Sequence, residues 1–131
     1  MKTNPRIFVV DDDPSWLEAL NRMLRKIGYD NIRSFTNGAD CLQNLQQNPK
    51  VIFLDYQMDD MDGLQVLWEI KKYNPFINVI FCTAHNNIEL AVSAIKYGSA
   101  EFLLKENISI KKVSDALERL MGEQGAVTKV Y

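Results

Sequence analysis

The sequence predicts an α/β fold built on a doubly wound parallel sheet of five strands. Short apolar runs of strand length alternate five times with segments whose apolar residues recur at helical spacing. Strands and helices that alternate in this way form a parallel sheet covered on both faces, with right-handed crossovers. With 131 residues, of which 47% are hydrophobic, the chain is long enough for one domain with its own core.

The first strand-and-helix unit is expected over residues 7–27. Residues 7–10 form a continuous apolar run, typical of a buried central strand, and three aspartates follow directly. Pro14 suits the start of a helix, and Gly28 suits its end. The apolar positions of this helix are Leu17, Leu20, Leu24 and Ile27.

The second unit is weaker. Residues 32–35 are half polar, as expected of a strand at the edge of the sheet. Asn37 and Gly38 form a turn that leads into a helix over residues 39–47.

The third strand, residues 51–54, is wholly apolar and ends directly at Asp55. A turn-rich acidic loop follows and ends at Gly63. The next helix closes at Asn74-Pro75, and its apolar positions are Leu64, Leu67, Ile70 and Tyr73.

The last two strands are expected at residues 77–82 and 100–104, and Thr83 and Lys105 follow them directly. The helix between them has Ile88, Ala91, Val92 and Ile95 at helical spacing. A final helix is expected over residues 109–121. We therefore predict one domain at residues 1–122 and a short C-terminal tail at residues 123–131.

This pattern is that of a flavodoxin-like (βα)5 architecture with strand order 2-1-3-4-5. In such sheets ligands bind outside the carboxyl ends of the strands, where the winding reverses direction. The chemically interesting side chains of this sequence all fall at those ends, and they are Asp11, Asp12, Asp55, Thr83 and Lys105.

Three carboxylates from two neighbouring strands predict a cation site. Two bare carboxylates about 4 Å apart repel by about 4 kcal/mol at an effective dielectric near 20, so such a cluster holds protons or a cation. Oxygen ligands without His or Cys favour a hard divalent ion such as Mg²⁺. A metal, the Lys105 ammonium and the Thr83 hydroxyl around Asp55 would suit phosphoryl transfer, with the carboxylate as nucleophile.

Composition excludes several other functions. A net charge of -2 and a pI near 5.4 argue against direct binding to nucleic acid. Cys41 and Cys82 lie in apolar surroundings without CxxC spacing, which indicates reduced core residues. The first apolar run is too short for a signal peptide or a membrane span, so a cytoplasmic location is expected.

Taken together, the strand-end residues resemble the receiver domain of two-component response regulators, of the chemotaxis-regulator type. The matching features are the Asp-Asp pair after strand one, Asp55 after strand three, Thr83-Ala84 after strand four and Lys105 after strand five. The resemblance covers essentially the whole chain. It implies that Asp55 accepts phosphate from a histidine kinase.

The same resemblance assigns a metal site. Asp12 and Asp55 would bind Mg²⁺ directly, the backbone carbonyl of Gln57 would be a further ligand, and Asp11 would act through water. Asp13, Asp59, Asp60 and Asp62 are instead expected to be solvated loop residues or helix caps.

Other positions acquire roles from the resemblance as well. Thr83 and Lys105 would hold the phosphoryl oxygens, and Phe102 matches the family's switch aromatic, which turns inward when the threonine moves toward the phosphate. Gln57 and His85 are candidates for tuning the rate of dephosphorylation.

The resemblance implies protein partners. These are a sensor histidine kinase or phosphotransfer protein, a downstream protein target or output domain, and a second copy of the chain through the face of the fourth helix, fifth strand and fifth helix. No activity is expected beyond Mg²⁺-dependent self-phosphorylation and autodephosphorylation, so the chain is not expected to be an enzyme in the usual sense.

The sequence departs from the family at three places. Asp59 follows Met58 where proline is usual, and Glu106 follows Lys105 where a cis proline is usual. A non-proline cis bond costs about 2.5 to 4 kcal/mol, so a trans bond is expected there. Phe102 lacks the hydroxyl of the tyrosine that often occupies the switch position.

Four other functions share parts of this pattern. A haloacid-dehalogenase-type hydrolase needs a general acid at the position of Gln57, and a flavin protein needs a Ser/Thr/Gly loop where three aspartates stand. An EF-hand would place its first ligand at Met58, although Asp60, Asp62, Gly63 and Glu69 keep the spacing. A degenerate receiver acting as a phosphorylation-independent interaction module is the main alternative.

Overall fold

The computed structural model describes residues 4–84 and 86–129, with side chains described as far as Gly122. Its centre is a five-stranded parallel sheet with the order β2-β1-β3-β4-β5, which confirms the predicted fold class and strand order. The five strands are β1 (Ile7–Val10), β2 (Ile32–Phe35), β3 (Val51–Leu54), β4 (Asn78–Thr83) and β5 (Glu101–Leu104).

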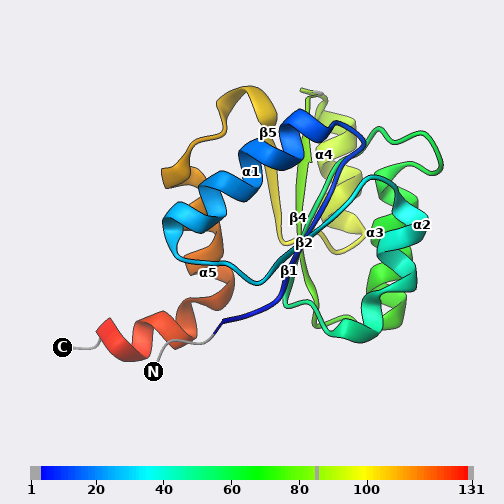
Figure 1. Ribbon diagram of the computed structural model, residues 1–131. Coiled ribbons are helices and arrows are strands. Elements are labelled where there is room, and N and C mark those ends of the chain that lie inside the picture. Colours follow the sequence, from blue (N-terminus) through cyan, green and yellow to red (C-terminus); the bar gives the residue numbers. More distant parts are fainter. Residues whose placement is uncertain (1–3, 85, 130–131) are drawn as a thin grey trace.

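Helices cover both faces of the sheet. In Figure 1 the sheet is seen on edge, with α1 and α5 on one side and α2, α3 and α4 on the other. The α-helices are α1 (Pro14–Ile27), α2 (Gly38–Gln43), α3 (Gly63–Tyr73), α4 (Ile88–Lys96) and α5 (Ile110–Lys129). Two short 3-10 turns, η1 (Leu45–Gln47) and η2 (Lys105–Asn107), complete the described chain.

Two apolar cores follow from the alternation of side chains along each strand. On β1, Ile7 and Val9 belong to the core beneath α1 and α5, whereas Phe8 and Val10 belong to the core beneath α2, α3 and α4. All four residues are almost completely buried, which explains why the central strands are continuous apolar runs. Cys41 and Cys82 are buried free thiols, as predicted.

Several element boundaries differ from the sequence prediction. The helix expected over residues 39–47 ends at Gln43, and the chain continues through the 3-10 turn η1 to Asn48, which has a left-handed backbone with φ 61°. Strand β4 starts one residue later than expected, since Asn78 is the residue that pairs with Val51. Thr83 is therefore the last residue of the strand rather than the first residue after it.

The C-terminal helix α5 extends beyond its expected end. Its backbone is helical to Lys129, with a non-helical conformation at Met121, where the sequence predicted the helix to stop. The boundary between a domain at 1–122 and a tail at 123–131 stays a prediction. Within the described chain, no helix is both long enough and apolar enough to cross a membrane.

Gly63 permits α3 to start directly against the end of β3. A Cβ at this position would lie 2.3 Å from the carbonyl oxygen of Asp55 and 2.8 Å from Cα of Tyr56. Because both neighbours are backbone atoms, Gly63→Ala is expected to lower the free energy of unfolding by about 2 to 3 kcal/mol. Urea denaturation measures this. Gly122→Ala is the matched control, since its Cβ would meet nothing within 4 Å, and a comparable loss there would contradict the steric explanation.

Candidate functional site

The parallel register brings the predicted site residues to one edge of the sheet. Val10 pairs with Leu54, so Asp11 and Asp55 follow at the same level on neighbouring strands. Thr83 pairs with Leu104, so Lys105 follows directly beyond the end of β5. This is the edge at which β1 passes into α1, in the upper part of Figure 1.

Three carboxylates converge there. One side-chain oxygen from each of Asp11, Asp12 and Asp55 lies within 4.8 Å of the others. Asp11 and Asp55 are buried, whereas Asp12 lies nearer the solvent. A cluster of three oxygen ligands that is open on one side fits a hard divalent cation that keeps part of its water shell.

Lys105 lies inside this cluster. Its Nζ donates to Oδ2 of Asp11 at 2.5 Å and lies 3.3 Å from Oδ1 of Asp55. The same Nζ is 5.1 Å from the centre of the Trp16 ring, which places a cation over an aromatic face. Because Oδ1 of Asp11 accepts from the backbone N–H of Asp13 at 2.9 Å, both oxygens of Asp11 already have protein donors.

The electrostatics of the two buried acids follow from this arrangement. Burial, together with the negative charge of Asp11, raises the pKa of Asp55 from 3.8 to about 6, although Lys105 opposes the shift. Burial also raises the pKa of Asp11. For Lys105, burial alone would lower the pKa, but the hydrogen bond to Asp11 and the charges of both aspartates raise it overall. Lys105 therefore stays an ammonium at neutral pH.

Thr83 and Phe102 occupy adjoining positions on β4 and β5. Thr83 is completely buried at the end of its strand. Phe102 is half-buried, and its ring stacks on Phe81 with centroids 6.0 Å apart and an interplanar angle of 19°. The ring of Tyr56, in the loop after Asp55, also lies near the Phe81 ring, with centroids 6.4 Å apart. Phe81 thus joins the loop after Asp55 to the fifth strand.

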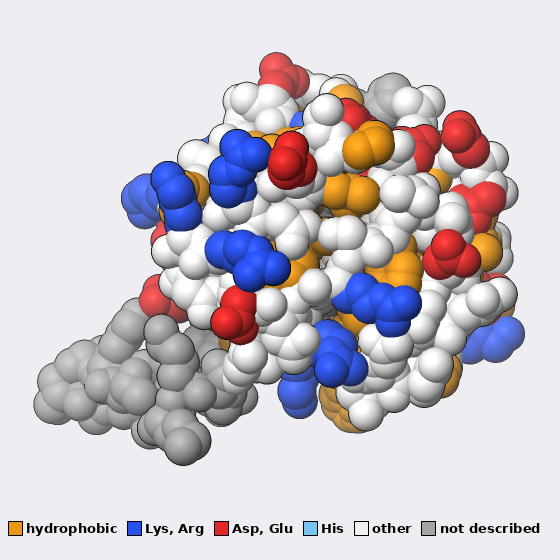
Figure 2. Space-filling model, in the orientation of Figure 1, with side chains coloured by type: hydrophobic (Ala, Val, Ile, Leu, Met, Phe, Trp, Pro, Cys, Tyr) orange, Lys and Arg blue, Asp and Glu red, His pale blue; other side chains and the backbone are white. Residues whose placement is uncertain are grey.

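The two residues predicted to tune dephosphorylation are Gln57 and His85. Gln57 is exposed in the loop between β3 and α3, and His85 lies outside the described residues. The peptide bond after Lys105 is trans, as predicted, and the chain turns there into the short helix η2. The exposed loop is acidic, and Figure 2 shows acidic side chains gathered at the upper right, where Figure 1 shows this loop.

Three of the four acids expected to be solvated or capping residues do act as caps. The carboxylate of Asp13 accepts from Ser15 N at 3.0 Å and caps α1, and that of Asp62 accepts from Gln65 N at 2.9 Å and caps α3. Asp60 caps α2 instead of its own neighbouring helix. Asp59 is an exposed loop residue.

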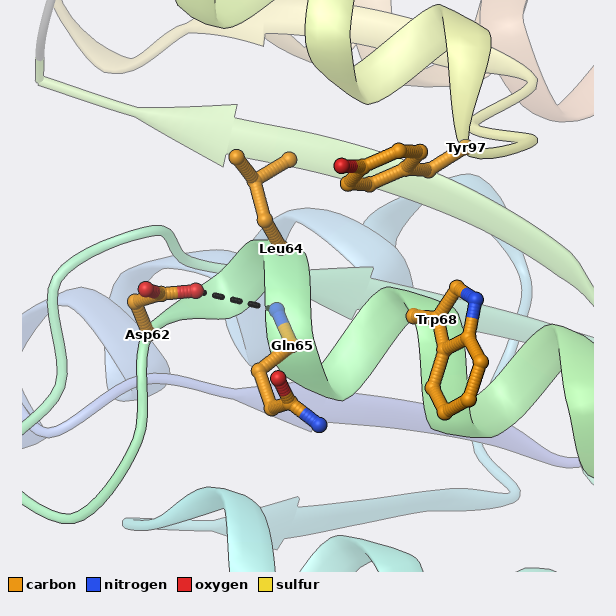
Figure 3. A pocket seen from close by; sticks show the side chains of 5 residues that line it. All are labelled: Asp62, Leu64, Gln65, Trp68 and Tyr97. Atoms are coloured by element: carbon orange, nitrogen blue, oxygen red, sulfur yellow. Dashed lines mark hydrogen bonds between the residues drawn. The ribbon is translucent and has the colours of Figure 1, made fainter.

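Two features of the structure have no clear signal in the sequence. Trp16 stands at a helical position of α1, and its ring lies against Lys105. A pocket of about 490 Å³ was not anticipated either. Figure 3 shows its lining from α3 and the end of α4, with Trp68 and Tyr97 on opposite sides. None of the predicted site residues lines this pocket.

A family model and solved structures match the chain. The model described as the response regulator receiver domain matches residues 7–118. A response regulator receiver domain protein of the CheY-like type from Methanospirillum hungatei superposes with a TM-score of 0.83 at 21% identity, covering 95% of this chain and 98% of that one. A receiver domain protein from Clostridium thermocellum gives a TM-score of 0.83 at 25% identity, covering 94% and 98%.

Curated relatives are longer proteins. The DNA-binding transcriptional regulator NtrC of Escherichia coli is 40% identical over 100 residues, which are 76% of this chain and 21% of that protein. The transcriptional regulatory protein ZraR of Escherichia coli is 38% identical over 103 residues, which are 78% of this chain and 23% of that protein. The chain therefore spans between a fifth and a quarter of the length of these relatives.

Proposed function

We propose that this chain, which belongs to the response regulator receiver domain family, accepts a phosphoryl group on the carboxylate of Asp55 in a Mg²⁺-dependent reaction. The observation that carries the proposal is the position of Asp55. It is a buried carboxylate at the end of the central strand β3, with Lys105 at 3.3 Å and two further acids close by. A group held in this way is a nucleophile with positive charge beside it.

The chain's own residues suit a Mg²⁺ ion. Asp12, Asp55 and the backbone carbonyl of Gln57 would hold it directly. Asp11 would act through water, a role supported by the protein donors already on both of its oxygens. When bound, the ion would offset negative charge on the phosphoryl oxygens during transfer.

The chemical step is an in-line displacement at phosphorus. One oxygen of Asp55 forms the new bond to phosphorus, and the bond to the donor's leaving group breaks, with the electron pair going to that group. The product is an acyl phosphate. Lys105, already in contact with Asp55, would move only a short distance to pair with a phosphoryl oxygen, and the Thr83 hydroxyl would donate to another.

Phosphorylation would be signalled through β4 and β5. When Thr83 moves toward the phosphoryl group, Phe102 would turn inward against Phe81, which it already contacts. That movement would change the surface of α4, β5 and α5. We expect protein partners to recognise this change: an output domain, a separate target, or a second copy of the chain.

Other partners follow from the proposed reaction. The phosphodonor would be a sensor histidine kinase or a phosphotransfer protein, and the setting would be the cytoplasm. The chain would not turn over a separate substrate, because its only chemistry is gain and loss of its own phosphoryl group. Gln57 and His85 are proposed to tune the rate of that loss.

Incubation with Mg²⁺ and acetyl phosphate tests the proposal. Intact-protein mass spectrometry should show one added phosphoryl group, and Asp55→Asn or removal of Mg²⁺ should abolish it. Asp59→Asn is the matched control and should keep the signal, since it removes a charge from the same loop without touching the nucleophile. No added mass with any donor would favour an interaction module, and sustained turnover of a phosphate ester would favour a hydrolase.

A further inference from the structure

We propose that Asp60 is a positioning residue for the cation site, because it ties the metal-binding loop to the start of α2. This inference rests on the proposed function. It concerns the loop between β3 and α3, which contains Gln57, the proposed carbonyl ligand. Asp60 itself would not touch the ion.

Both oxygens of Asp60 are used in this tie. Oδ1 accepts from the backbone N–H of Gly38 at 3.1 Å, and Oδ2 accepts from that of Ala39 at 2.9 Å. These are the first two N–H groups of α2, which have no acceptor within the helix. Slight burial alone would raise the pKa of Asp60, but hydrogen bonds from the backbone of Ala39, Gly38 and Met61 lower it overall.

The start of α2 is held in place by its packing against the core. Gly38 is buried, and a Cβ there would lie 2.6 Å from Cγ2 of Val66 and 3.1 Å from Cγ of Met61. Cys41, one turn further on, is completely buried in the core. The next N–H, that of Asp40, is capped by the side chain of Asn37 at 2.8 Å. Asp60 therefore binds to a part of the molecule that is already held in place.

The two hydrogen bonds of Asp60 restrain the loop that contains Gln57, the proposed carbonyl ligand. On one side of Gln57, the carbonyl of Tyr56 accepts from Gly63 N at 2.7 Å. On the other side of Gln57, the carboxylate of Asp60 accepts from the N–H groups of Gly38 and Ala39. No proline restricts the backbone between Gln57 and Asp60, so these two hydrogen bonds add a restraint to this part of the loop. Asp62 cannot replace it, since Figure 3 shows its carboxylate turned toward Gln65 N of its own helix.

A loop that is free before binding must be ordered when the ion binds, and this weakens binding. Loss of the tie should therefore weaken Mg²⁺ binding without removing any ligand. The test must separate the loss of a negative charge from the loss of the hydrogen bonds to α2, because any acid near the site attracts a cation. Asp59 allows this separation, since it is the adjacent acid of the same loop and makes no such tie to α2.

The experiment is a Mg²⁺ titration in a Trp68→Phe background, in which Trp16 near Lys105 is the remaining tryptophan. Asp60→Ala should raise the dissociation constant for Mg²⁺ by roughly fivefold relative to Asp59→Ala, the order expected for a lost cap. Asp60→Asn keeps one acceptor oxygen, so its dissociation constant for Mg²⁺ should lie between those of the two alanine variants. Circular dichroism without Mg²⁺ should show all variants folded, and if Asp60→Ala is not, Asp60→Asn is compared with Asp59→Asn instead.

Equal dissociation constants for the variants at positions 59 and 60 would overturn the inference, because only the shared charge would then matter. In that case the background protein would still bind Mg²⁺ and accept phosphate, so the proposed function would stand. A background protein that does not respond to Mg²⁺ would overturn both.

Discussion

Lys105→Met is expected to slow phosphorylation of Asp55 by acetyl phosphate by about 100-fold or more, the usual effect of removing one donor that stabilises transition-state charge. The ammonium lies 2.5 Å from Asp11 and 3.3 Å from Asp55, so it is in place before the donor arrives. The methionine side chain has similar length and no charge. Quenched samples analysed by intact-protein mass measure the rate, because this readout does not depend on the Trp16 ring that Lys105 contacts.

The same substitution should also lower stability. Without Lys105, Asp11 and Asp55 are left as neighbouring buried acids, and we expect the metal-free protein to lose about 2 kcal/mol at pH 7. Lys111→Met is the control, since Lys111 pairs with Asp115 on the exposed surface of α5. Exposed pairs of this kind contribute little. A phosphorylation rate unchanged by Lys105→Met would exclude its proposed role in charge stabilisation.

Asp55→Asn is expected to stabilise the metal-free protein by about 2 kcal/mol at pH 7. The pKa of Asp55 is raised from 3.8 to about 6, which corresponds to at most about 3 kcal/mol. The folded state thus favours the protonated carboxyl. Wild-type stability should fall, relative to the variant, as the pH rises from about 4 through 6, and the two proteins should differ little below pH 4.

Denaturation at pH 4, 5, 6 and 7 in the presence of a chelator measures this difference. Mg²⁺ should reverse it, because the ion would stabilise wild type and not the variant. Asp59→Asn serves as the control and should change stability little at any of these pH values, since Asp59 is exposed. A wild-type protein more stable than Asp55→Asn at pH 7 without metal would show that Lys105 outweighs the burial of Asp55.

The sheet was predictable because its strands are buried on both faces. A strand in that environment must be apolar throughout, so Val51–Leu54 is visible in the sequence as an uninterrupted run that ends at Asp55. The convergence of Asp11, Asp55 and Lys105 was predictable for a related reason. Parallel strands in register end at the same edge, and each of these residues directly follows a strand.

Contacts that depend on packing between distant segments were not predictable. The carboxylate of Asp60 reaches Gly38 and Ala39, about twenty residues earlier, and the sequence shows only an acid in a loop. Trp16 occupies a helical position in α1, and its ring lies against Lys105, about ninety residues later in the chain. The early end of α2 was not predictable either. Leu45 reaches the core through the 3-10 turn η1, without a continuation of the helix.

Reductive trapping shows whether Asp55 is the residue that carries the phosphoryl group. Borohydride reduces an acyl phosphate to an alcohol, so a phosphorylated aspartate becomes homoserine at its own position in the chain. After incubation with Mg²⁺ and acetyl phosphate, peptide mapping should find homoserine at position 55 alone. Homoserine at position 11 or 12 with Asp55 intact, or a phosphoryl group retained elsewhere, would contradict the assignment.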